Sequence, residues 1–110
     1  MFGHDWVKHD GKIIDRHRKH SHDSNAVHEY VVDVRPLGHP DAEPLMRALV
    51  QEPHLAADWW SPGIGATVTV EVDTHGNVRF DRHDPRLSYK AVKEHRKDSF
   101  DATLHQPPGT

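Results

Sequence analysis

The sequence predicts a mostly β protein: a small OB-like or SH3-like antiparallel β-barrel of five or six strands, followed by a C-terminal α-helix. Apolar and polar residues alternate through residues 67–73 and again through 78–81, which is the pattern of strands with one buried face. Gly76 lies between these runs and suits the left-handed position of a short hairpin loop. Shorter alternating runs precede the hairpin, and residues 86–104 contain no glycine or proline, which favours a helix.

The N-terminal part begins with a turn signal. Asp10-Gly11 is typical of a two-residue turn and has apolar residues on both sides, so we expect a short hairpin there. A long strand then covers residues 11–22 and is charged after Ile14. Because charged side chains discourage pairing with further strands, we expect an edge strand or a projecting arm.

Two more strands are expected in the middle of the chain. Residues 27–35 alternate clearly, and the proline-rich residues 36–44 form a connection. Residues 45–51 suit a strand or a short helix, but the flanking Pro44 and Pro53 limit their length and favour the strand. The residues expected to face the core are Tyr30, Val32, Val34, Met46, Ala48 and Val50.

The C-terminal segment has a helix start signal, Asp84-Pro85, which reads as an N-cap followed by proline. We expect a helix from Pro85 or Ser88 to about residue 100 that packs loosely and frays after His95. Its apolar stripe is irregular and consists of Leu87, Ala91 or Val92, His95, Phe100 and Leu104. The expected organisation is a barrel over 5–81, a helix within 82–104, and flexible tails at 1–4 and 105–110.

Composition restricts the possible functions. The 110 residues include no cysteine, which excludes disulfides, thiolate nucleophiles and cysteine zinc sites. No apolar run approaches a membrane span, so we expect no membrane insertion and a cytoplasmic location. The net charge of -3 combines +2 in residues 1–22, -7 in 23–81 and +2 in 82–110. An acidic body argues against extensive binding to phosphate backbones.

Catalytic motifs are not found in the sequence. It contains no nucleophile elbow, phosphate loop, HExxH motif or EF-hand spacing. Gly63-Ile64-Gly65 precedes a strand rather than a helix, which is the wrong setting for dinucleotide binding. We therefore expect a protein that is not an enzyme and needs no cofactor.

A resemblance to a known family comes from the strands taken together. The chain carries Gly-x-Ile-Ile, Tyr-x-Val, Pro-x-x-Gly, and Val-x-Val-x-Val-Asp followed by Val-x-Phe-Asp. This arrangement resembles a family of small bacterial β-barrel domains of unknown function that is common in actinobacteria. The resemblance implies a five- or six-stranded barrel and assigns no catalytic residues. The matching positions are Gly11, Ile13, Ile14, Tyr30, Val32, Pro62, Gly65, Val68, Val70, Val72, Asp73, Val78 and Phe80, and residues 84–88 resemble a segment that follows such barrels.

The leading functional hypothesis is a protein-interaction module or accessory subunit. Trp59 and Trp60 lie in an expected loop over residues 54–65, and exposed tryptophans are common at interfaces. At least one of the two indoles is expected to close the end of the barrel instead. The other candidate partner surfaces are the charged first strand, with Arg16, Arg18 and Lys19, and the helix.

Two alternatives use the same first strand. Arg16, Arg18 and Lys19 form a basic tract that could bind single-stranded nucleic acid, with Trp6 or one of the paired tryptophans as a stacking platform. The second alternative is a transition-metal site formed by His17, His20 and His22. In an extended strand His17 points away from the other two, so this site would need a bend or bulge. A more ordinary interpretation is that these histidines face solvent.

Overall fold

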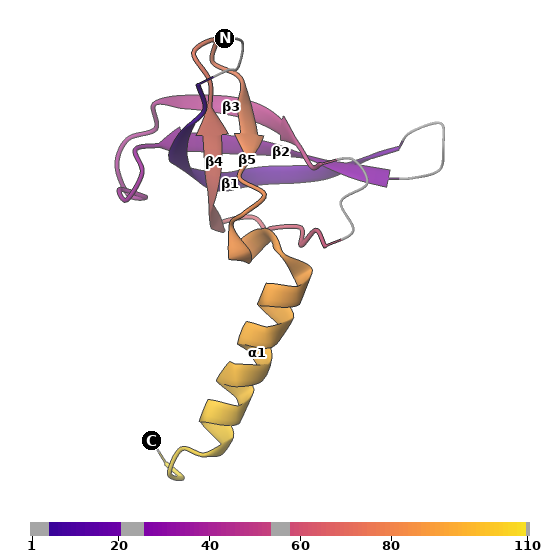
Figure 1. The fold of residues 1–110 in the computed structure, drawn as a ribbon, viewed down its shortest axis with the longest axis vertical. Helices are drawn as coiled ribbons and strands as arrows, with labels where there is room; N and C mark the ends of the chain where they lie inside the picture. Colours follow the sequence, from indigo (N-terminus) through magenta and orange to yellow (C-terminus); the bar gives the residue numbers. More distant parts are fainter. Residues whose placement is uncertain (1–4, 21–25, 54–57, 110) are drawn as a thin grey trace.

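A computed structural model describes residues 5–20, 26–53 and 58–109. Five antiparallel strands form one sheet that curls into a half-barrel, and a C-terminal helix extends away from it (Figure 1). The order of the strands in the sheet is β3-β2-β1-β4-β5. The predicted fold class is therefore confirmed. The elements are β1 (Val7–His20), β2 (Ala26–Arg35), β3 (Met46–Gln51), β4 (Thr67–Val72), β5 (Val78–Phe80), the 3-10 turn η1 (Pro85–Leu87) and α1 (Tyr89–Leu104).

The core lies on the inner face of the curled sheet. Its side chains alternate with polar ones along each strand, as the period of two requires. Tyr30 is the largest fully buried side chain, and its hydroxyl reaches Ser61 Oγ at 2.6 Å, so its polar end is not left unpaired. The inward positions predicted for β2 and β3 are confirmed, although Met46 and Ala48 are only partly buried. The buried core consists of Ile13, Tyr30, Val32, Val34, Val50, Val68, Val70, Phe80 and Leu87.

The hairpin predicted at Asp10-Gly11 is wrong, because β1 runs straight through both residues. Gly11 lies in the doubly paired part of the strand, opposite Val34 on β2 and Val68 on β4. A Cβ atom at this position would lie 2.7 Å from a methyl group of Val70 and 2.9 Å from one of Val32. The glycine is thus required by close packing across the sheet rather than by a turn.

The two halves of β1 have different surroundings. The first half, Val7–Lys12, pairs with β4, while Asp10–His20 pairs with β2. The register shifts between Ile13 and Asp15, which marks a bulge where the strand leaves β4.

β1 is the central strand of the sheet, and Gly11 and Lys12 pair on both sides, so the prediction of an edge strand or projecting arm from residue 11 is wrong for this part. After the bulge, the charged second half is paired on one side only among the described residues. The predicted end at residue 22 lies outside those residues.

The β4–β5 hairpin is confirmed, and a carboxylate organises its turn. Gly76 has a φ of 81°, as expected for a left-handed turn residue. Asp73 Oδ1 accepts hydrogen bonds from the backbone N–H groups of His75 at 2.9 Å and Asn77 at 2.8 Å. Asp73 is itself buried, so these bonds compensate for its loss of hydration.

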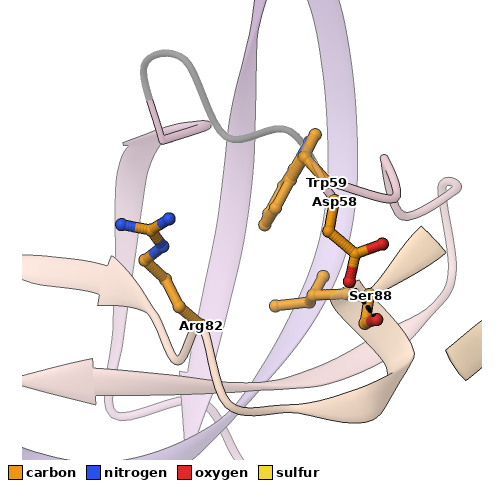
Figure 2. A pocket seen from close by; sticks show the side chains of 5 residues that line it. Asp58, Trp59, Arg82 and Ser88 are labelled. Carbon is orange, nitrogen blue, oxygen red and sulfur yellow. Dashed lines mark hydrogen bonds between the residues drawn. The ribbon is translucent and has the colours of Figure 1, made fainter. Parts of the chain in front are cut away.

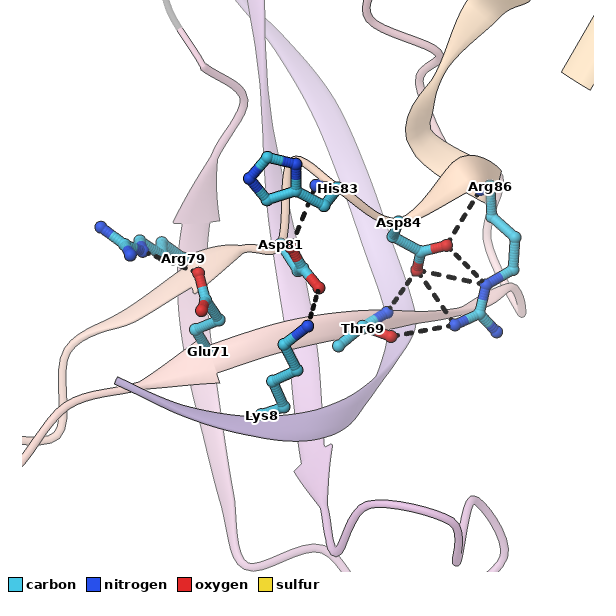
Figure 3. Close-up of polar contacts among 8 residues, drawn as sticks. All are labelled: Lys8, Thr69, Glu71, Arg79, Asp81, His83, Asp84 and Arg86. Atoms are coloured by element: carbon cyan, nitrogen blue, oxygen red, sulfur yellow. Dashed lines mark hydrogen bonds and ion pairs between the residues drawn. The ribbon is translucent and has the colours of Figure 1, made fainter. Parts of the chain in front are cut away.

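Ion pairs cover the outer face of the sheet near β4 and β5 (Figure 3). Buried carboxylates there are matched by cations whose side chains remain half exposed. A buried charge without a partner would destabilise the fold, and the paired cation offsets this cost. The pairs in this cluster are Lys8 with Asp81 at 3.3 Å, Arg79 with Glu71 at 3.0 Å, and Arg86 with Asp84 at 3.0 Å.

The predicted helix start is confirmed in two steps. Asp84 caps η1 by accepting a bond from Arg86 N, and Ser88 caps α1 by accepting one from Ala91 N. The helix then continues without a break to Leu104, beyond the predicted end near residue 100 and without the predicted change after His95. Helix-forming residues are sufficient for this, because α1 buries no residue.

Candidate interaction surface

The two tryptophans lie where the sheet meets the helix. Residues 58–60 run antiparallel to residues 87–89 and are joined to them by backbone hydrogen bonds. Trp60 N donates to Leu87 O at 3.0 Å, and Tyr89 N donates to Asp58 O at 2.9 Å. This pairing fixes the position of both indoles relative to the first turn of α1.

Asp58 strengthens this junction by capping the helix from outside. Its carboxylate accepts hydrogen bonds from the Ser88 hydroxyl and from Lys90 N, the latter at 2.8 Å. These bonds favour the ionised carboxylate, so the pKa of Asp58 is lowered, first by Ser88 and then by Lys90 N. A carboxylate at a helix N-terminus also interacts favourably with the helix dipole.

Trp59 is partly buried and packs against the core. Its ring lies 5.2 Å from that of Phe80, which in turn meets Tyr30 edge-on at 5.1 Å. One of the two tryptophans therefore packs against the barrel interior, as expected for at least one member of the pair.

Trp60 faces the helix instead. Its ring lies 6.0 Å from that of Tyr89, and the Arg96 guanidinium lies 4.6 Å from the centre of the indole. Arg96 is two turns along α1 from Tyr89, so a single indole spans the first half of the helix. We call Trp60, Tyr89 and Arg96 the Trp60 junction. It combines three side chains of the types that dominate protein interfaces.

A small cavity lies beside the paired segments 58–60 and 87–89 (Figure 2). Its volume of about 80 Å³ is well below the roughly 300–1,000 Å³ of typical ligand pockets. The Ser88 hydroxyl at its rim donates to Asp58, but the same oxygen caps the helix by accepting a bond from Ala91 N at 3.2 Å. The contact between Ser88 and Asp58 therefore has a structural role. The residues that line the cavity are Asp58, Trp59, Arg82, Leu87 and Ser88.

The predicted basic tract is not brought together on one surface. Arg16 lies opposite the buried Tyr30 and donates to Ser61 Oγ at 3.1 Å and Pro62 O at 3.0 Å. Arg18 shares this side of β1, whereas Lys19 lies on the other side, 3.9 Å from Glu29. The expected stacking platform Trp6 is covered by the Arg79 guanidinium, 3.9 Å from the ring centre.

Of the three predicted metal ligands, His17 is the one whose side chain the structure describes. His17 Nε2 lies 2.9 Å from Glu29 Oε1 on the outer face. The pKa of Glu29 is lowered, chiefly by a hydrogen bond from Gln51. Its burial acts in the opposite direction, but a hydrogen bond with His17 lowers the pKa further. Among the described residues, no group of three or more His, Asp or Glu side chains could hold a metal ion. The His20 side chain and His22 lie outside them.

The exposed side of α1 was not identified from the sequence. The predicted stripe joined Leu87, Ala91 or Val92, and His95 to Phe100 and Leu104, but its two ends differ in exposure. Leu87 is buried, whereas Phe100 and Leu104 are 69% and 67% exposed. Counting 3.6 residues per turn from Tyr89 would have placed Phe100 and Leu104 on its side of the helix.

Comparison with family models, curated proteins and solved structures finds no match for this chain. The resemblance to small actinobacterial barrels therefore stays a prediction. Within the part of the chain that the structure describes, no helix has both the length and the hydropathy to cross a membrane.

Proposed function

We propose that the protein is a non-enzymatic interaction module, which binds another protein through the Trp60 junction and the exposed side of α1. The observation that carries this proposal is the stack of Trp60 on Tyr89 and Arg96 at the base of a helix that leaves the sheet. Aromatic residues and arginine supply most of the binding energy at protein interfaces.

Preorganisation supports the same function. The backbone bonds between residues 58–60 and 87–89 hold the indole before any partner arrives. An interface whose anchors are already ordered loses less conformational entropy on binding. The apolar side chains farther along α1, Phe100 and Leu104, extend the exposed surface away from the sheet.

The chemistry of the acidic groups supports a non-catalytic role. The carboxylates with lowered pKa values take part in structural contacts: Asp33 with Arg47, Asp84 with Arg86, Asp58 with the start of α1, and Glu29 with Gln51. Groups engaged in this way stabilise the fold and are poorly placed to transfer protons.

Protein binding is favoured over nucleic-acid binding by the separation of the basic residues. Arg16 and Arg18 lie on one side of β1 and Lys19 on the other, next to Glu29. A phosphate backbone binds best to a concentrated basic surface, which this strand does not offer. A cytoplasmic location is part of the same proposal, and fractionation of source cells tests it.

Affinity capture from source cells tests the function. Tagged wild-type protein is expected to retain a companion in stoichiometric amount, and Trp60→Ala is expected to lose it. The matched control is Leu49→Ala, which truncates an exposed apolar side chain on β3, outside the Trp60 junction. Circular dichroism checks that both variants fold. A companion captured equally by Trp60→Ala, or only nucleic acid in the eluate, contradicts the proposal.

A further inference from the structure

One side of α1 combines cations with apolar side chains and carries no acidic residue. Helical spacing places positions i, i+4, i+7, i+8, i+11 and i+15 on the same side. Starting from Tyr89, these positions are Lys93, Arg96, Lys97, Phe100 and Leu104. We call these six residues the cationic face. Glu94, Asp98 and Asp101 follow the same spacing on the neighbouring side.

The cations of this face differ from those of the sheet. Lys8, Arg47 and Arg79 each lie within 3.3 Å of a carboxylate. By contrast, Lys93, Arg96 and Lys97 form no ion pair with a carboxylate among the described residues. Unmatched positive charge on an otherwise acidic protein is available to an external anionic group.

The apolar members of the face are exposed beside these cations. Tyr89 is 50% exposed and Phe100 is 69% exposed. Trp60 adds a large ring at one end, held in place by Arg96. On this face Tyr89 lies about three turns from Phe100, Leu104 lies one turn beyond Phe100, and the three cations lie between the two apolar ends. An amphipathic helix packed along α1 contacts both apolar ends and the cations between them.

We propose that the cationic face binds an acidic amphipathic helix of a partner protein, an inference that rests on the proposed function and specifies the chemistry of its partner. The partner's apolar side chains pack against Tyr89, Phe100 and Leu104. Its Glu or Asp side chains pair with Lys93 and Lys97 at the flank. Charge complementarity of this kind steers association and selects among partners.

Other anionic partners fit this surface less well. Both Tyr89 and Arg96 contact the Trp60 ring, which leaves a base little room to stack on it. An anionic bilayer is an extended surface, so it would also face the sheet domain, and residues 1–81 carry a net charge of -5. A second copy offers Glu94, Asp98 and Asp101, but no large apolar residue lies between them on that side.

A binding assay with a defined probe tests the inference. The probe is a labelled peptide of about 18 residues with Leu at i, i+3, i+4 and i+7 and Glu elsewhere. The matched control peptide carries Lys in place of every Glu. Fluorescence anisotropy on the full chain is expected to give at least about tenfold tighter binding of the acidic peptide. Raising NaCl from about 50 to about 500 mM is expected to weaken it.

Variants locate the binding site. Lys93→Glu/Lys97→Glu is expected to weaken binding of the acidic peptide by at least about tenfold. The control Arg18→Glu/Lys19→Glu makes the same change in net charge on β1 and is expected to stay within about twofold. Phe100→Ala/Leu104→Ala is expected to weaken binding by about fivefold or more, because it removes the apolar contacts without changing the charge.

Each contrary result has a distinct meaning. Weak binding of the acidic peptide, or equal losses in the α1 and β1 charge variants, overturns the inference. The inference is also overturned if the chain binds vesicles containing phosphatidylglycerol, or a single-stranded oligonucleotide, more tightly than the acidic peptide. Sedimentation showing that a second copy covers α1 would overturn it as well. If a companion is still captured in a Trp60-dependent manner, only the partner's acidic chemistry is overturned. If the companion is also missing, the proposed function fails as well.

Discussion

The sheet and the helix treat the same kinds of side chain in opposite ways. Phe80 on β5 is 3% exposed and contacts two other aromatic rings, whereas Phe100 on α1 is 69% exposed. Arg47 on β3 pairs with Asp33 at 2.6 Å, while Lys93 on α1 forms no ion pair with a described carboxylate. On the sheet these side chains stabilise the fold, whereas the same kinds of side chain on α1 are exposed or form no ion pair with a described carboxylate.

The largest expected effect contrasts the two phenylalanines. Phe80→Ala removes a buried ring and leaves a cavity, so it is expected to lower the free energy of unfolding by about 3–5 kcal/mol. Phe100→Ala removes an exposed ring and is expected to change it by less than about 0.5 kcal/mol. Urea denaturation followed by tryptophan fluorescence measures both values. Similar losses in the two variants would show that α1 packs against the sheet.

Glycine substitutions give the next largest effect. Gly11→Ala places a methyl group 2.7 Å from Val70 and 2.9 Å from Val32, so the strands must move apart. We expect a loss of about 1–3 kcal/mol in the free energy of unfolding, as for other overpacked cores. The control is Gly63→Ala, where no atom lies within 4 Å of the added methyl group. A stable Gly11→Ala variant would mean that β1 turns at this residue after all.

Gly11 also marks the limit of what the sequence predicts about the fold. Alternation identified β2, β4 and β5, because it reports burial directly. Asp10-Gly11 instead matched a turn by local chemistry, and only the positions of Val32 and Val70, far away in sequence, exclude a side chain there. Requirements for close packing depend on the assembled sheet and leave no local pattern.

The candidate site was predictable only in part. Trp59 and Trp60 stood out as a pair, but their different environments follow from the backbone pairing of residues 58–60 with 87–89, a long-range contact. The role of Asp58 as an external helix cap is likewise set by this pairing. The exposed face of α1, by contrast, follows from helical spacing alone once the helix boundaries are known.

Acid is expected to destabilise the sheet through its buried carboxylates. Burial is the largest single influence on the pKa of Asp84 and raises it. Hydrogen bonds from Arg86 and from Thr69 N together outweigh burial, so the pKa is lowered overall. The pKa of Asp33 is lowered chiefly by its bond with Arg47. A lowered pKa in the folded state stabilises the fold above the unfolded value of about 3.9, and this contribution is lost as pH falls through the folded pKa.

We therefore expect the free energy of unfolding to decrease from pH 5 to pH 2, measured by urea denaturation. Asp84→Asn is expected to flatten this pH dependence, because it removes one of the groups that take up a proton on unfolding. The control Asp41→Asn removes an equal charge from an exposed position in the β2–β3 connection and is expected to keep the wild-type slope. Equal slopes in wild type and Asp84→Asn would contradict this assignment.

The smallest effect on stability is expected from removing the outer half of the helix. A chain ending at Arg96 keeps the half-buried Ala91 and Val92 and the contact of Arg96 with Trp60. Its free energy of unfolding is expected to stay within about 0.5 kcal/mol of the full chain, since the described residues that are removed, 97–109, are exposed. Binding of the acidic peptide is nevertheless expected to weaken more than in Phe100→Ala/Leu104→Ala, because Lys97 is removed together with Phe100 and Leu104. A decrease of more than about 1 kcal/mol in the free energy of unfolding would instead show that the removed residues stabilise the fold. A truncated chain that binds the peptide as well as the full chain would confine the interaction to the Trp60 junction.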